Sequence, residues 1–342
     1  MEKSGLSDLT FSYLFFYEQA GSEAVAIAYF QNVHFKIRHY QFPLIGNFLI
    51  RPIEKLLMNN GFHILVCGNL FRVDFPGFYI QQDKTTVQEI FQSMQEFFKT
   101  SRPKPHAVLM KDWQSENMDD ALIKYGYHPW PGDLTMKLDL QHKWMSFSDY
   151  VASLKHKYAQ RVRRIRTRCT SITRKEMQLE DIEKYGKELE ALYCNVVKKQ
   201  VIRLIIATDR YFFEMKKAYG PAFKVIGYFE NEQLIAFSSH IIYPELWELH
   251  YIGMDYSKNE IHQLYFNMMY DGVEMAIDAG KKAVELGRTA REAKAMLGGK
   301  PVYFNSYFRL RGWIVRLLVG RFSGAFDEKA GAAWKIRQPF KN

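Results

Sequence analysis

The sequence predicts an α/β (α+β) protein built from two tandem copies of one αβ unit. Three observations favour this fold. The chain of 342 residues can hold two domains, and an apolar fraction of 47% is sufficient for packed cores. Apolar periods of 2 and 3.6 residues alternate along the chain. The order strand, helix, strand, helix, strand occurs in both halves, so we predict domains at residues 1–140 and 141–342.

In the first half, a helix is expected over Leu9–Glu18, and aromatic and β-branched residues predict strands over residues 24–42. Residues 85–100 form an amphipathic helix with a continuous apolar side. The other expected elements are a helix over 53–59, strands within 62–82, a strand over 107–110, a helix over 118–125 and an alternating strand over 134–140.

In the second half, glycine and proline mark the ends of several predicted elements. We expect helices over 147–168, 181–199 and 211–218, strands over 223–229, 234–243 and 246–254, a helix over 259–279, a strand over 283–286, a helix over 290–297, a strand over 301–310 and weak helices over 313–321 and 328–334.

Composition narrows the classes of protein. The three cysteines are far apart and have no metal-binding spacing, so we expect no disulfide framework and no metal site. No apolar run reaches the about 18 residues of a membrane helix, and the N-terminus lacks a secretory pattern. We therefore expect a cytoplasmic protein. Its oligomeric state is not indicated.

The net charge of +10 is concentrated in residues 151–175, which carry nine lysines and arginines and no acid. Arg161, Arg164 and Arg168 would share one helix face. Such a face suits a phosphate-rich partner, such as coenzyme A, tRNA or a lipid headgroup, although charge runs are usually solvated surfaces. No aromatic residues suited to stacking on bases are interleaved with these arginines. The segment 308–322 also combines apolar residues with arginines, so it is either a membrane-surface contact or a packed terminal helix.

Residues 246–289 are the centre of the second unit. Strict alternation would place Glu248 and His250 on one face of the strand and Tyr251 on the other. Either Glu248 or His250 is a candidate base for amine acylation, and Tyr251 is a candidate for contacting the substrate and donating to its leaving group. The alternatives are a solvated ion pair and a core tyrosine. His240 fits a structural histidine better than a base.

Two polar groups flank the helix of this stretch. Asp255, Ser257 and Asn259 lie at its start, where backbone N–H groups bind anions, so they are candidates for contacting the donor. A second group of candidates follows the next strand: Glu285 for the substrate, Arg288 for the donor's charge and Lys294 for polarising a carbonyl. The alternative for this second group is a solvated basic helix.

Two passages resemble a known family. ALIKYGYHPWPGDLTMKLDL followed by YVASLKHKYAQRVRRIRTR is similar to the domain junction of Fem-like aminoacyltransferases, and VELGRTAREAKAMLGGKP resembles their segment after the long helix. The chain is thus identified as similar to the FemAB-like and BioF2-like group, in which two GCN5-related N-acetyltransferase (GNAT) units occur in tandem. The resemblance implies mixed, mostly antiparallel sheets flanked by helices, with the donor site in the second unit.

The resemblance implies an N-acyltransferase that moves an acyl or aminoacyl group directly from an activated donor to an amine. Acyl-CoA is the favoured co-substrate. One alternative is a transferase that uses aminoacyl-tRNA and a peptidoglycan precursor, and another is a non-catalytic binding module. The glycine-containing pyrophosphate loop of ordinary GNATs has no counterpart in MDYSKNEIHQLYF. We find no pattern of a covalent nucleophile.

Overall fold

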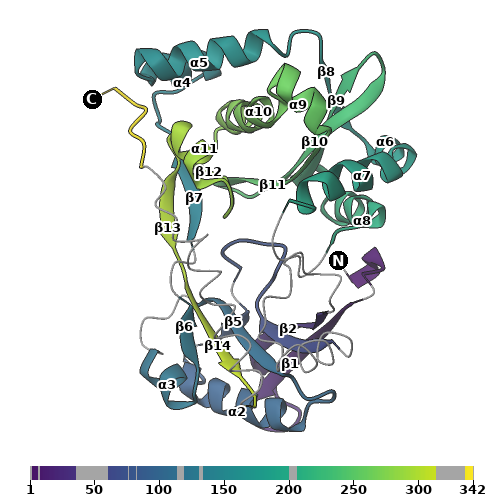
Figure 1. The fold of residues 1–342 in the computed structure, drawn as a ribbon. Helices are drawn as coiled ribbons and strands as arrows, with labels where there is room; N and C mark the ends of the chain where they lie inside the picture. Colours follow the sequence, from purple (N-terminus) through teal and green to yellow (C-terminus); the bar gives the residue numbers. More distant parts are fainter. Residues whose placement is uncertain are drawn as a thin grey trace, which may run out of the picture.

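A computed structural model describes residues 2–6, 8–35, 61–75, 77–81, 83–113, 119–130, 134–199, 206–312 and 336–341. Two seven-stranded sheets organise this part of the chain (Figure 1). The first has the strand order β1-β2-β3-β5-β14-β6, with β4 paired to β2. Its strands are β1 (Leu9–Tyr17), β2 (Ala24–Phe35), β3 (Phe62–Cys67), β4 (Phe78–Ile80), β5 (Ala107–Trp113), β6 (His128–Trp130) and β14 (Asn305–Leu310).

The second sheet has the order β13-β7-β12-β11-β10-β9-β8. Helices α7 and α8 pack on one of its faces, and α10 packs on the other. Its strands are β7 (Leu134–Asp139), β8 (Thr173–Met177), β9 (Phe223–Glu230), β10 (Gln233–Ile242), β11 (Leu246–Met254), β12 (Ala283–Glu285) and β13 (Lys300–Tyr303). The helices of the described residues are η1 (Glu2–Ser4), α2 (Val87–Thr100), α3 (Asp119–Lys124), α4 (Phe147–Ser153), α5 (His156–Thr167), α6 (Leu179–Lys184), α7 (Gly186–Val197), α8 (Asp209–Tyr219), η4 (Gly220–Ala222), α9 (Tyr256–His262), α10 (Leu264–Asp278) and α11 (Arg291–Met296).

The predicted repeat is present in both sheets. Each sheet is antiparallel except for one parallel pair, β3 with β5 in the first and β11 with β12 in the second. Helix α2 lies between the first pair in sequence, and α9 and α10 lie between the second pair. A parallel pair needs such a crossover connection, which explains why strand, helix, strand is the repeated element. The predicted α/β fold class is therefore confirmed.

The two sheets do not follow the predicted division at residue 140. Strand β7 precedes that point but lies between β12 and β13 in the second sheet. Strand β14, expected as the end of the second unit, lies between β5 and β6 in the first. The predicted strand 301–310 is thus two strands, β13 and β14, which run as one ribbon along both units in Figure 1. Each unit gives one strand to the sheet of the other.

Several element predictions are corrected. Leu9–Tyr17 is a strand that pairs with β2 along its length; a short apolar run does not distinguish helix from strand. The helix expected over 147–168 is interrupted because Leu154 and Lys155 bond to the C-terminal segment near Phe340. Breaks also divide the helices expected over 181–199 and 259–279. The strands β6 and β8 were not predicted. The helices expected over 53–59, 313–321 and 328–334 lie outside the described residues.

One hydrophobic core joins the two units. The buried residues Leu9, Val33, Val66 and Phe71 of the first unit belong to the same cluster as the apolar side chains of α7, α8 and β9–β10. Burying apolar surface between the units favours a single packed body over two loosely linked domains. In the described part of the chain, no helix combines the length and apolarity that crossing a bilayer demands.

Candidate active site

A cavity of about 740 Å³ opens where two parallel strands separate. Strands β11 and β12 pair over three residues, from Leu246 with Ala283 to Glu248 with Glu285, and β12 then ends. Residues 249–254 form one wall of the cavity and residues 286–290 the opposite wall. Within the described residues, no strand pairs with this edge of β11 beyond Glu248, so its backbone N–H and C=O groups face the cavity side.

A β-bulge changes the predicted faces of β11. The register with β10 passes from Ile252 opposite Ser238 to Leu249 opposite His240, so His250 and Tyr251 together oppose Ser239. The Tyr251 N–H donates to Ser239 Oγ at 3.0 Å, and the Ser239 hydroxyl donates back to the Tyr251 carbonyl at 3.3 Å.

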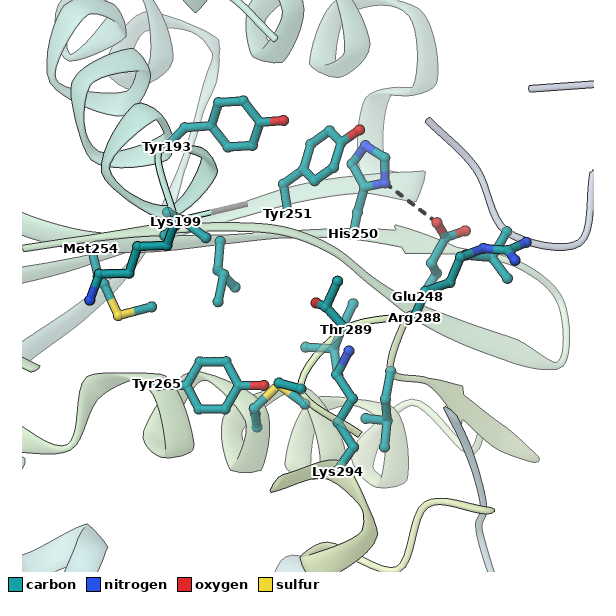
Figure 2. Close-up of a pocket in the computed structure, with 18 of the residues that line it drawn as sticks. Tyr193, Lys199, Glu248, His250, Tyr251, Met254, Tyr265, Arg288, Thr289 and Lys294 are labelled. Carbon is teal, nitrogen blue, oxygen red and sulfur yellow. Dashed lines mark hydrogen bonds and ion pairs between the residues drawn. The ribbon is translucent and has the colours of Figure 1, made fainter. Parts of the chain in front are cut away.

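The prediction that Tyr251 lies opposite His250 is therefore wrong. The extra residue places both side chains on the face that carries α7 and α8, with ring centroids 4.1 Å apart (Figure 2). Tyr251 also packs near Tyr193 of α7, at 5.1 Å between centroids. Burial raises the pKa of the Tyr251 hydroxyl far above its ordinary value, so this group stays protonated.

Glu248 and His250 form a buried hydrogen-bonded chain with Tyr211 of α8. His250 Nδ1 lies 3.4 Å from Glu248 Oε1, and its Nε2 lies 2.7 Å from the Tyr211 hydroxyl. Burial lowers the pKa of His250, against the opposing effect of Glu248. A neutral His250 that donates from Nδ1 would accept from Tyr211 at Nε2, so both ring nitrogens have partners.

Glu248 is held by groups from both units. Arg72, in the first unit, places its Nε 3.3 Å from Glu248 Oε2, and the Tyr243 hydroxyl donates to the same oxygen at 3.0 Å. The side chains of Arg72 and Glu248 are only 7% and 4% exposed, so the ion pair is desolvated. The Arg72 guanidinium lies 4.9 Å from the centre of the Tyr243 ring.

Lys294 enters the cavity from α11, on the side of β11 opposite His250 (Figure 2). It is 4% exposed, and no hydrogen bond to its ammonium is found among the described residues. Burial lowers the pKa of Lys294 to about 7, although nearby Glu285 raises it. The absence of a side chain at Gly287 leaves room for the ammonium, because a Cβ there would lie 3.3 Å from Nζ.

Glu285 and Arg288, two further predicted site residues, form hydrogen bonds or an ion pair with other protein groups. Glu285 accepts hydrogen bonds from the Thr135 hydroxyl and, at 2.6 Å, from the Gly287 N–H, and it does not line the cavity. Burial raises its pKa to about 6. Arg288 lines the cavity, but its guanidinium forms an ion pair with Asp112 of the first unit and stacks on Phe304.

Only one of the three residues predicted to bind an anion at the start of the helix lines the cavity. The Asp255 carboxylate accepts from Ser257 N at 2.8 Å and from its hydroxyl at 2.7 Å, and these hydrogen bonds lower the pKa of Asp255. Neither residue lines the cavity. Asn259 does, while its Oδ1 accepts from the Tyr265 N–H at 2.8 Å across the break between α9 and α10.

Sequence reasoning missed several residues that line or support the cavity. Arg72 comes from a loop nearly 180 positions before Glu248. The sequence predicts Tyr211 only as part of a helix. Lys199, just after the end of α7, places its ammonium over the Tyr256 ring. The turn signals near Gly68 marked the first loop, but no local pattern indicates that it enters the second unit.

Two other predictions concern residues away from the cavity. His240 is buried, with its ring nitrogens 2.8 Å from the Ser238 hydroxyl and 3.0 Å from Trp247 Nε1, as expected for a structural histidine. On α5, Arg164 and the adjoining Arg168 are exposed, whereas Arg161 packs over the Phe266 ring at 4.5 Å. No group of three metal-binding side chains occurs among the described residues.

The strand exchange, the parallel pairs and the cavity between their separating strands define a fold of two tandem GNAT units. No protein-family model and no curated protein matches the chain. Solved structures do. A crystal structure of FemX is similar with a TM-score of 0.51 and 10% identity over 92% of this chain and 90% of that chain. A tandem GNAT protein from the clavulanic acid biosynthesis pathway is similar with a TM-score of 0.54 and 10% identity, covering 90% and 85% of the two chains.

At this identity the likeness shows the fold. It confirms the predicted tandem GNAT-like, Fem-like architecture, including mixed sheets flanked by helices.

Proposed function

We propose that the protein is an N-acyltransferase that passes an acyl group directly from an activated donor to an amine. The observation that carries this proposal is Lys294, a buried lysine with no hydrogen-bonding partner among the described residues, inside a cavity whose other wall is the open edge of a strand. A neutral amine that attacks a carbonyl must give up a proton as the N–C bond forms, and a lysine with a pKa of about 7 is suited to accept it near neutral pH.

In the proposed reaction, the acceptor nitrogen attacks the carbonyl carbon of the donor thioester or ester. The new N–C bond forms, the amine proton passes to the neutral Lys294 amine, and the C–S or C–O bond then breaks. The Lys294 ammonium returns the proton to the leaving sulfur or oxygen. Positioning supplies much of the rate in such a direct transfer, and no covalent enzyme intermediate is required.

Acyl-CoA is the donor that we favour. Its pantetheine arm is an extended chain with two amide groups, which can pair with the free edge of β11 as an added strand would. The cavity volume of about 740 Å³ suits such an arm together with a small acyl group. Lys199 and Asn259 also line the cavity and are available to contact a polar donor, whereas Asp255 and Ser257 are assigned to capping α9.

Aminoacyl-tRNA is the second candidate donor, and a specific observation favours it. Arg163 and Arg164 on α5 and Arg168 just after it are exposed and form no ion pair within the described residues. This exposed face suits a polyanion larger than a nucleotide cofactor. The acceptor in that case would be a peptidoglycan precursor.

Ligand-induced stabilisation separates the two donors. If acyl-CoA is the donor, coenzyme A should raise the melting temperature and tRNA should not; ligand at 100 times its Kd adds about 2.7 kcal/mol. The reverse result, with a steep salt dependence removed by Arg164→Gln, would favour tRNA. Stabilisation by neither, with no amide product from either donor, would contradict the transferase proposal and favour a binding module.

The role of Lys294 is tested by Lys294→Met. We expect the substitution to lower kcat/KM by roughly 10²- to 10⁴-fold, the usual contribution of general base catalysis. The wild-type kcat/KM should rise with pH through about 7 as the lysine loses its proton, and the variant should lack this rise. The matched control is Lys300→Met on exposed β13, which should retain full activity. Equal activity in both variants would exclude Lys294 as the proton acceptor.

A further inference from the structure

A second cavity, of about 640 Å³, lies between the face of the first sheet and the end of α8. Rings from both units line it: Tyr13 on β1, Tyr29 on β2, Phe75 in the loop after β3 and Tyr219 at the end of α8. The ring centroids of Tyr13 and Tyr29 are 5.3 Å apart, and those of Tyr29 and Phe75 are 6.0 Å apart. The volume is in the range of small-molecule sites.

The aromatic lining is partly uncovered. Tyr13 is 49% exposed and Tyr219 is 44% exposed, so both rings are accessible to a ligand. The lining continues outward across the sheet, where Phe15 pairs with Ile27 and Ile27 pairs with Tyr79. Phe15, Ile27 and Tyr79 are all exposed, and a contiguous apolar patch of this kind is typical of a binding surface.

The Arg72 side chain lines both cavities. Its guanidinium carbon lies 6.0 Å from the Phe75 ring on the side of the second cavity, and its Nε contacts Glu248 in the first. The Arg72 side chain therefore separates a molecule that fills the second cavity from the first cavity.

Carboxylates lie farther out along the same cavity. Glu2 accepts a hydrogen bond from the Tyr13 hydroxyl, and Glu214, which is 8% exposed, pairs with Arg210 at 3.1 Å. Lys3 and Lys217 line the same cavity, so its charged side chains are of both signs. The ring faces provide the attraction for an incoming ammonium.

We propose that the second cavity binds the acceptor and that this acceptor is a primary amine carried on an aromatic body, an arylalkylamine. The inference rests on the proposed transferase function and names the acceptor class for it. The aromatic body stacks among Tyr13, Tyr29, Phe75 and Tyr219, and the amine points past Arg72 toward the first cavity.

The test compares tyramine with ethanolamine, a primary amine without a ring. In calorimetry on the full chain without donor, tyramine should bind saturably and ethanolamine much more weakly. Tyr219→Ala should weaken tyramine binding roughly two- to tenfold, the usual effect of one stacked ring. The matched control is Tyr303→Ala on β13, where the ring is 68% exposed and outside both cavities. Tyr13→Ala serves as an independent second variant.

The outcomes distinguish this inference from the proposed function. Acyl transfer to amines with the same KM for tyramine in Tyr219→Ala and Tyr303→Ala would overturn the acceptor site and leave the transferase standing. If Tyr219→Ala and Tyr13→Ala both weaken the binding of tyramine, the acceptor site is supported. A failure of every donor to give product would then count against the transferase proposal alone. No saturable binding of tyramine would overturn the inference.

Discussion

At the scale of single residues, the site is defined by which buried charges have partners. Glu248 is held by Arg72 and Tyr243, and His250 lies between Glu248 and Tyr211. Lys294 has no such partner in the part of the chain that the structure describes, and burial lowers its pKa to about 7. Buried titratable groups with shifted pKa values are typical of functional sites, because a charge without compensation lowers stability and is retained for another reason.

The pH dependence of stability reports the state of Lys294. Its folded pKa is below the ordinary 10.5, so burial of the charged form costs most below pH 7, and the cost disappears as pH rises toward 10.5. Lys294→Met should therefore be more stable than the wild type at pH 6, with a difference that shrinks at higher pH. Urea unfolding at pH 6 and pH 9.5 measures this. A difference that does not depend on pH would show that the pKa is not lowered.

The Arg72 and Glu248 pair gives a second prediction at this scale. Arg72→Met leaves Glu248 charged and buried, so we expect a loss of about 3–5 kcal/mol of unfolding free energy. Arg72→Met combined with Glu248→Gln should recover part of this loss. A double-mutant cycle by urea unfolding measures the coupling between the two side chains. Additive effects would indicate that the contact between the units does not depend on this pair.

At the scale of elements, the bulge in β11 determines which side chains meet. One extra residue moves Tyr251 to the face of His250 and returns Ile252 and Met254 to the face of α10. Ser239 satisfies both backbone groups of Tyr251 at the irregularity. Gly253 follows it, and any Cβ there would lie 2.6 Å from the Tyr193 nitrogen of α7. The strand therefore packs against α7 with no space for a side chain.

Ser239→Ala tests the bulge. The substitution fits the space but leaves the Tyr251 N–H and C=O without their hydroxyl partner, so we expect a loss of about 1–3 kcal/mol in the free energy of unfolding. The ring contact between His250 and Tyr251 should also loosen, which near-ultraviolet circular dichroism detects. Ser12→Ala on β1, where the hydroxyl accepts from the Asn32 side chain, is the control. An effect no larger than in the control would contradict the role of Ser239.

At the scale of the whole molecule, exchange of β7 and β14 joins the units. Each of these strands lies inside the sheet of the other unit, and a shared hydrophobic core lies between the units. The first cavity takes lining residues from both, with Arg72 from one unit and β11 and α11 from the other. A site assembled in this way requires both units to be packed together.

Cutting the chain at residue 140 should therefore prevent independent folding. The fragment 1–140 lacks β14 between β5 and β6, and 141–342 lacks β7 between β12 and β13. We expect each fragment alone to be aggregated or digested rapidly by protease, and the two co-expressed fragments to assemble. Limited proteolysis and size-exclusion chromatography measure this. A folded, protease-resistant 1–140 fragment would show that the exchange is dispensable.

Local patterns predicted most elements of the second unit, because amphipathic helices and alternating strands carry their own periodicity. They failed for β1, whose apolar run fits a helix equally well, and for the helices broken by contacts with distant residues, such as α4 and α5 at Lys155. The sequence indicates Lys294 as a candidate, but its burial without a hydrogen-bonding partner among the described side chains is a property of the packed structure.

The sequence by itself determined the repeated αβ units and their order, because these depend on apolar period and turn residues within short windows. Only the tertiary structure decided which sheet β7 and β14 enter, that Arg72 reaches Glu248, and that Tyr251 turns toward His250. Each of these depends on contacts between residues far apart in the chain or on a single inserted residue in a strand. Neither leaves a periodic signal in the sequence around it.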